Sequence, residues 1–168
     1  MDAMDLIAEK EILRRAILDY GKVPQKIKAI EELAELIHAL SIGNPKMIAE
    51  EMADVSIMLE QLKLIYNNAA EVEGYRSERA KKATRKTKPP IEELSKLIQV
   101  IAKNNDLCLV AEKIADTYLM IEILKTTYHN AKKVEGYRKY KLERLNYRLL
   151  NLESQIENEG GECIGANG

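Results

Sequence analysis

The stretch AEEMADVSIMLEQLKLIYNNAAEVEGYR at 49–76 is repeated as AEKIADTYLMIEILKTTYHNAKKVEGYR at 111–138. Ahead of each copy stands a second matching pair, AIEELAELI at 29–37 and PIEELSKLI at 90–98. The copies therefore align over 29–76 and 90–138 with a one-residue insertion. Apolar residues recur in both at three- and four-residue spacing, which is typical of amphipathic helices. The chain is thus predicted to fold as a duplicated helical unit.

The same spacing continues along the chain, and Gly, Pro and Asn mark its breaks. The expected helices cover about 4–20, 24 to the SIGNP turn at 41–45, 45–68, 72–83, 90–103, 106–130 and 134–157. In the second helix the residues expected to face inward are Ile27, Ile30, Leu33, Leu36, Ile37 and Leu40. Ala, Leu, Ile, Glu and Lys are abundant and only eight glycines and four prolines occur, so a β-rich fold is unexpected.

One all-α domain is expected over 1–158, made of repeats at about 22–85 and 88–150, with 159–168 as a flexible tail. Either repeat alone has too few helices to bury its apolar faces. Two repeats related by an approximate two-fold axis would bury them against each other in a four-helix-bundle core. The first helix has no counterpart in the second repeat, so we expect it to cross or cap the bundle.

The charge balance is nearly even, with 26 Lys and Arg against 27 Asp and Glu and a net charge of -1. Such a chain has no overall field that attracts nucleic acid or an anionic membrane. The basic segment KKATRKTK at 81–88 lacks aromatic residues and is interpreted as a linker. No apolar run approaches the roughly 20 residues that span a bilayer, and the N-terminus does not resemble a signal peptide. We expect a cytoplasmic protein without a nucleic-acid or membrane partner.

The two cysteines, Cys108 and Cys163, form no CxxC or CxH pattern. A structural disulfide or a zinc site therefore has little support.

Four acids in the first repeat form an ExxE motif and an ExxD motif, Glu32 with Glu35 and Glu51 with Asp54. Residues three apart lie on one face of a helix, and the SIGNP turn should return the second helix antiparallel to the first. Both acidic pairs would then face each other. Carboxylates at such spacing repel one another unless cations bind them, and oxygen-only ligands suit magnesium or manganese. The quartet is therefore a candidate metal site, with Mg²⁺ as the expected ion.

The second repeat departs from this pattern, since its matching residues are Glu93, Lys96, Lys113 and Asp116. An ammonium group beside a divalent cation is repulsive, so a second complete metal site is not expected. Instead, Lys96 or Lys113 is expected to form ion pairs with Glu93, Glu112 or Asp116. One working site per chain is predicted.

The motifs EELAE at 31–35 and EEMAD at 50–54 resemble those of the MazG-like family of all-α nucleoside triphosphate pyrophosphohydrolases, which includes the dimeric dUTPases. The segment VEGYRKYKLERLNYRL at 134–149 is also similar to the C-terminal helix of small members, and the resemblance covers about 20–150. It implies that magnesium held by the quartet bridges the triphosphate. Water then attacks the α-phosphorus and releases pyrophosphate and a nucleoside monophosphate. The resemblance also implies that one of the four acids, or Glu50, positions the water.

Phosphate oxygens also need cationic donors. The candidates are Arg76, Arg79, Lys81 and Lys82 from the first repeat, and Lys125, Arg138, Lys141 and Arg144 from the second. Asn68 and Tyr75, with their counterparts Asn130 and Tyr137, are candidates for contacts with the sugar or base, although helix capping and packing explain them as well.

The leading hypothesis is a magnesium-dependent pyrophosphohydrolase that acts on a non-standard or deoxynucleoside triphosphate in control of the nucleotide pool. The alternative is a non-catalytic helical binding or assembly module that has kept the fold. Fusion of two copies is compatible with a monomeric pseudo-dimer or with a homodimer. The sequence does not reveal which base or sugar is preferred.

Overall fold

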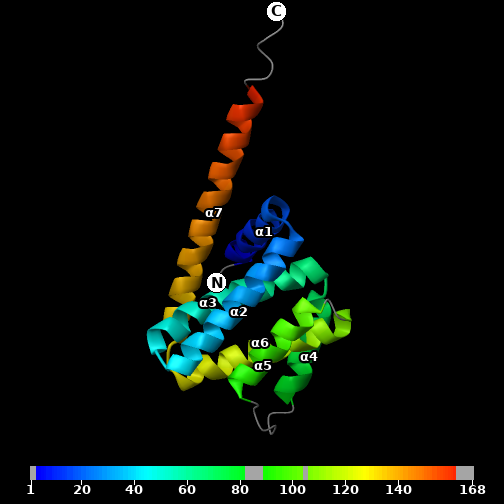
Figure 1. Cartoon of the computed structure of the whole chain (residues 1–168), viewed down its shortest axis with the longest axis vertical. Helices are drawn as coiled ribbons and strands as arrows, with labels where there is room; N and C mark the ends of the chain where they lie inside the picture. Colours follow the sequence, from blue (N-terminus) through cyan, green and yellow to red (C-terminus); the bar gives the residue numbers. More distant parts are fainter. Residues whose placement is uncertain (1–2, 82–88, 104–105, 162–168) are drawn as a thin grey trace, which may run out of the picture.

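The computed structural model describes residues 3–81, 89–103 and 106–161, and every regular element in these ranges is an α-helix (Figure 1). The predicted all-α class is confirmed. The helices are α1 (Ala3–Tyr20), α2 (Lys22–Ile42), α3 (Pro45–Tyr66), α4 (Ala69–Lys81), α5 (Pro90–Ala102), α6 (Leu107–Thr127) and α7 (Ala131–Gly161).

The breaks between helices have local causes that the sequence contains. Gly43 ends α2 in the left-handed region, with φ 73°, and Asn44 caps α3 by accepting hydrogen bonds from the N–H groups of Lys46 and Met47. Pro45 follows at the first helical position, where its missing N–H costs nothing. The two tail helices also begin alike, because Asn67 and His129 occupy aligned positions and both have φ of 50°. The same turn therefore follows α3 and α6.

The two repeats pack through corresponding contacts. In the first repeat α2 packs on α3, in the second α5 packs on α6, and the repeats meet through α2 with α5 and α3 with α6. The tail helices are exchanged, since α4 of the first repeat packs on α6 and α7 of the second packs on α3. In Figure 1, α7 lies against α3, while α4 lies against α6. Each repeat thus covers a surface of the other.

The core contains apolar side chains from both repeats at helical spacing. Its largest fully buried members include Leu33, Leu36, Met52, Leu59, Leu94, Leu97, Ile114 and Ile121. The expectation that Ile27 faces inward is wrong, because its side chain is 53 % exposed. Ile27 lies in the first turns of α2 beside exposed Val23, and no described helix covers that face.

Helix α1 packs against α7, α3 and α2, so it covers the bundle on the side where α7 passes. Leu13 joins Ile57 of α3 and Leu142 of α7 in a small separate apolar cluster. Arg15 anchors the same contact by donating a hydrogen bond to the Leu149 carbonyl, at 2.7 Å. This position agrees with the expectation that the unmatched helix caps the bundle.

Beyond these contacts α7 extends away from the body of the molecule (Figure 1). It continues to Gly161, so residues 159–161 of the expected tail are helical, while 162–168 lie outside the described residues. Of the basic linker at 81–88, residues 82–88 also lie outside the described residues. Among the described helices, none has the length and apolar character needed to cross a bilayer.

Candidate metal and phosphate site

Three of the four predicted acids converge. Helix α2 carries Glu32 and Glu35 three residues apart, and α3, packed against α2, carries Glu51. One carboxylate oxygen from each lies within 4.8 Å of the other two. Glu32 is buried, Glu51 is half-buried and Glu35 is exposed, so the cluster lies at the edge of the core with an opening to solvent.

Asp54, the fourth acid, has a different partner. Its carboxylate accepts a hydrogen bond from the ammonium group of Lys141, which reaches across from α7. Both side chains are about four-fifths buried, with relative exposures of 18 % and 20 %. A cation from the second repeat therefore lies at the border of the first repeat's acidic cluster.

The electrostatics of the cluster favour a bound cation. The pKa of Glu51 is raised to about 7, chiefly by burial and then by the negative charges of Asp54 and Glu35, against the opposing effect of Lys141. Burial also raises the pKa of Glu32, although a hydrogen bond from Lys28 at 2.8 Å opposes this. For Asp54, burial raises the pKa and the hydrogen bond from Lys141 lowers it. The two lysines leave the negative charge of the cluster incompletely compensated.

The donor set fits a hard divalent ion such as Mg²⁺ or Mn²⁺. Carboxylate oxygens are the ligands such ions prefer, and Mg–O bonds of about 2.1 Å place ligand oxygens about 3.0 Å apart when adjacent and about 4.2 Å apart when opposite. One oxygen from each of Glu32, Glu35 and Glu51 lies within 4.8 Å of the other two, so the side chains would draw closer to bind one ion. A bound divalent cation would also remove the repulsion that raises the pKa of Glu51.

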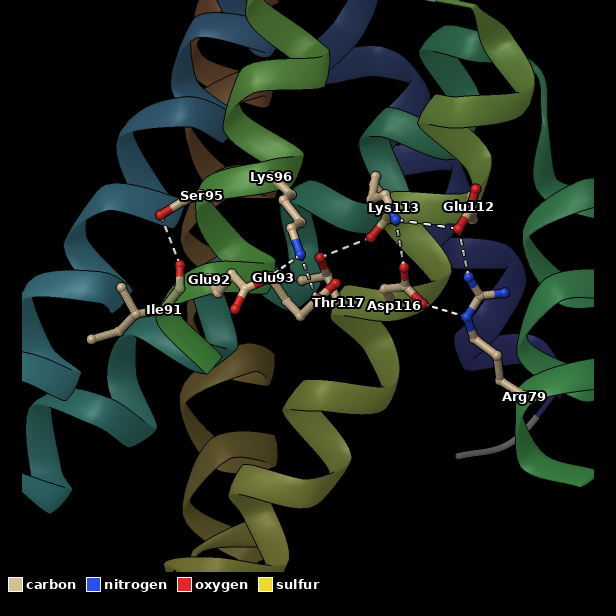
Figure 2. Close-up of polar contacts among 10 residues, drawn as sticks. All are labelled: Arg79, Ile91, Glu92, Glu93, Ser95, Lys96, Glu112, Lys113, Asp116 and Thr117. Carbon is tan, nitrogen blue, oxygen red and sulfur yellow. Dashed lines mark hydrogen bonds and ion pairs between the residues drawn. The ribbon is translucent and has the colours of Figure 1, made fainter. Parts of the chain in front are cut away.

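The corresponding place in the second repeat is filled by protein cations (Figure 2). Lys113 of α6 lies 3.0 Å from Asp116 and 3.2 Å from Glu112, and Lys96 of α5 lies 3.2 Å from Glu93. The prediction that these lysines form ion pairs is confirmed. Among the described residues, the three-carboxylate arrangement occurs in the first repeat alone.

Arg79 completes this second network from α4. Its guanidinium group lies 2.8 Å from Glu112 and also pairs with Asp116 (Figure 2). Arg79 aligns with Lys141 in the repeat, just as Asp116 aligns with Asp54. Each exchanged tail helix therefore places a cation beside Asp54 or its counterpart Asp116 in the other repeat. The sequence predicts both cations as phosphate-binding candidates but does not predict this reciprocal pairing. The alignment shows that Arg79 and Lys141 correspond, but it does not show which helix each tail helix packs on.

Four of the other predicted phosphate-binding residues have partners of their own, and Lys81 is exposed at the end of α4. Arg76 lies 2.9 Å from Glu73 and stacks over the Tyr118 ring. Arg138 pairs with Glu9 of α1, and Lys125 lies 2.9 Å from Glu122. Arg144 lies over the Tyr140 ring at 5.8 Å, and Lys82 falls outside the described residues. Of the described candidates, Lys141 is the one that the structure joins to the first repeat's quartet.

Asn68 and Asn130 occupy aligned positions before α4 and α7, and both are buried. Their side-chain amide groups make no hydrogen bond within the described part of the chain, while their backbone carbonyls accept from Val72 and Val134. The packing expected of their neighbours is present, since Tyr75 and Tyr137 both lie against the core. Nothing in the structure explains the two unpaired amides.

Comparisons of the chain with models of known protein families, with curated proteins and with solved structures found no match. The chemistry of the site therefore has to be inferred from its own residues. These supply three convergent carboxylates and a fourth acid held by a lysine from the other repeat.

Proposed function

We propose that this protein is a magnesium-dependent nucleoside triphosphate pyrophosphohydrolase of MazG-like type. The observation that carries the proposal is the convergence of Glu32, Glu35 and Glu51, with Lys141 bound to the neighbouring Asp54. The reaction would consume a nucleoside triphosphate and water, and it would form a nucleoside monophosphate and pyrophosphate. Acids that hold a metal and a cation beside them match what this reaction needs.

The roles of the residues follow from their positions. Glu32, Glu35 and Glu51 would hold Mg²⁺, or Mn²⁺ in its place, and Asp54 would join them once Lys141 turns to the substrate. The bound metal would neutralise charge on the phosphates and lower the pKa of water. Lys141 would donate to a phosphate oxygen in exchange for Asp54. Glu50 is half-buried beside Glu51 on α3 and is a candidate for orienting the attacking water.

We further propose that α2, α3, α5 and α6 form a pseudo-two-fold four-helix bundle in which one chain does the work of two protomers. The corresponding contacts of the two repeats and the exchange of α4 and α7 support this arrangement. The ion pairs of Lys96 and Lys113 support one working site per chain. In this proposal the second repeat is a structural mate that also supplies Lys141.

A second candidate is a non-catalytic helical module, and the ion pairs within the first site favour it. Lys28 and Lys141 already pair with Glu32 and Asp54, so half of the quartet has protein partners. In that case the acids would be balanced by these lysines and would need no metal. The two candidates differ in whether a divalent cation stabilises the fold.

The deciding experiment measures pyrophosphate release from a panel of canonical-base, deoxy, uracil-containing and oxidised triphosphates, with Mg²⁺ and with chelator. We expect Mg²⁺-dependent release from one or a few of them. The Glu51→Gln variant should lose turnover while it keeps its helical circular dichroism. No release from any substrate by well-folded protein, together with no stabilisation by Mg²⁺, would favour the non-catalytic module.

A further inference from the structure

An open groove of about 630 Å³ lies between the start of α3 and the first turns of α7. Lys46 lines it from α3, and Lys133, Gly136, Tyr137 and Tyr140 line it from α7. Tyr140 is 56 % exposed, whereas Tyr137 packs against the core. The groove thus offers the ring of Tyr137, which packs against the core, the exposed ring of Tyr140, over which Arg144 lies at 5.8 Å, and two lysines.

The groove borders the acidic site on both of its helices. On α7, Tyr137 precedes Lys141 by one helical turn, and Lys141 is bonded to Asp54. On α3, Lys46 precedes Glu50 by one turn, and Glu51 follows directly. A molecule with its phosphates at the acids has this groove within reach along α7.

A smaller groove of about 220 Å³ lies at the aligned place on α4 and is lined by Glu71, Gly74, Tyr75 and Glu78. These positions align with Lys133, Gly136, Tyr137 and Tyr140. The first groove therefore has a lysine and a tyrosine where the second has two acids. The two grooves differ in the same way along the chain as the two acidic sites. The groove beside the three carboxylates carries lysines and two tyrosines, whereas the groove beside the ion-paired site carries two acids and one tyrosine. Once a cation is bound at the three carboxylates, both changes favour binding of an anionic, aromatic ligand in the first site alone.

The two lysines are available to a ligand. Within the described residues, the ammonium groups of Lys46 and Lys133 make no hydrogen bond or ion pair with another side chain. An ammonium group donates hydrogen bonds and accepts none, so a ring bound beside it must present acceptors such as carbonyl oxygens. Aromatic rings supply flat faces on which a base stacks.

We propose that this groove is the seat of the substrate's nucleobase, with the ring against Tyr140 and Tyr137 and a carbonyl-bearing edge toward Lys46 and Lys133. The inference deepens the proposed pyrophosphohydrolase function and rests on it. It assigns base recognition to α7 of the second repeat. It also sets a preference for bases whose edge carries carbonyl oxygens, such as uracil, over bases with an amino group there, such as cytosine.

Gly136 allows a direct test with a matched control. A Cβ added at Gly136 or at its counterpart Gly74 would meet no atom within 4 Å, so both helices accept a side chain there. Gly136→Leu fills the proposed seat, and Gly74→Leu fills the acidic groove. We expect Gly136→Leu to raise KM by about tenfold or more with little change in kcat, because base stacking is lost. Gly74→Leu should leave both constants within about twofold, and both variants should melt no lower than the parent protein. Equal KM values for the two variants would contradict the proposal that this groove binds the nucleobase.

The lysines are tested by charge reversal. Lys133→Glu should reduce the ratio of kcat/KM for dUTP to that for dCTP by about fivefold or more, whereas Lys132→Glu, the same change at the exposed neighbour outside the groove, should preserve it. An equal rise in KM for both substrates would place Lys133 at the phosphates and would contradict base recognition.

A binding measurement separates this inference from the proposed activity. Calorimetry on the Glu51→Gln variant with dUMP and dCMP needs no turnover, and the preference for dUMP should disappear when Gly136→Leu is added. If the parent protein releases no pyrophosphate but Gly136→Leu abolishes dUMP binding, the activity is wrong and the seat stands. If it hydrolyses triphosphates but Gly136→Leu changes neither KM nor dUMP binding, the activity stands and the seat is wrong.

Discussion

Lys141 donates a hydrogen bond to Asp54, so a side chain from the last helix of the second repeat enters the acidic site of the first. At the aligned positions Arg79 pairs with Asp116 in the opposite direction. The exchange of α4 and α7 makes both contacts possible, because each tail helix packs on the other repeat. In the first repeat the pair borders a cluster of carboxylates, and in the second Lys113 joins it.

Replacing Lys141 should therefore destabilise the protein through Asp54. In Lys141→Met the Asp54 carboxylate loses its partner while it stays largely buried, which should cost about 1–3 kcal/mol of unfolding free energy at pH 7. Loss of the lysine also leaves the rise in the pKa of Asp54 by burial unopposed. The cost should then shrink toward pH 5, as the carboxylate takes up a proton. Urea unfolding at the two pH values measures both effects.

Lys139→Met is the matched control for Lys141→Met, since Lys139 is an exposed lysine on the same helix. It should change the unfolding free energy by less than about 0.5 kcal/mol at either pH. If the two variants lose the same free energy, the buried pair does not stabilise the fold as described.

The raised pKa of Glu51 predicts how stability depends on pH. Its folded pKa of about 7 lies above its ordinary value of 4.5, so the folded state binds the proton more tightly than the unfolded state. This contribution to stability is fully present below pH 4.5 and is lost as the pH rises through 7. In chelator, the melting temperature should therefore fall between pH 5 and 8 by more in the parent protein than in Glu51→Gln. Saturating Mg²⁺ should reduce the fall in the parent protein, and parallel curves for the two proteins in chelator would contradict this account.

The sequence predicted the helices and the acidic cluster because both depend on local periodicity. Three-residue spacing places Glu32 with Glu35 on one helix face, and the capped turn at Asn44 returns α3 onto α2. These relations involve residues that are close together in the chain, so the sequence of one repeat is enough to predict most of them.

Contacts between distant segments were not predictable in the same way. Asp54 and Lys141 are 87 residues apart, and their pairing requires that α7 dock on α3 and not on α6. Periodicity shows which face of α7 is apolar but not which helix it covers. Arg138 pairs with Glu9 of α1, which has no counterpart in the second repeat, so the alignment could not predict it. Ile27 is a further case, because it lies on the exposed side of α2 with Val23, while Gln25 and Ala29 of the same turns are buried.

Magnesium should stabilise the fold through the three convergent carboxylates. Binding at ten times the dissociation constant contributes about 1.4 kcal/mol, which corresponds to a rise of roughly 3–6 °C in the melting temperature of a domain of this size. Glu35→Gln should remove most of this shift, because it removes one of the three carboxylates of the cluster. Glu35 is exposed, so the substitution should leave the core intact. Glu31→Gln changes an exposed acid of α2 that lies outside the cluster and should keep the shift. Equal shifts in both variants would place the ion elsewhere.

The second repeat should depend on its lysines for stability and not for turnover. Lys113 pairs with Asp116 and Glu112, and the Lys113 and Asp116 side chains are only 13 % and 15 % exposed. Lys113→Met leaves these acids with Arg79 alone, so we expect a loss of about 1–3 kcal/mol in unfolding free energy. Lys125→Met removes a pair with the exposed Glu122 and should cost less than about 0.5 kcal/mol. Below its unfolding transition, Lys113→Met should keep the parent kcat for pyrophosphate release. A large fall in kcat with intact helical signal would instead place Lys113 in the working site and end the description of the second repeat as a structural mate.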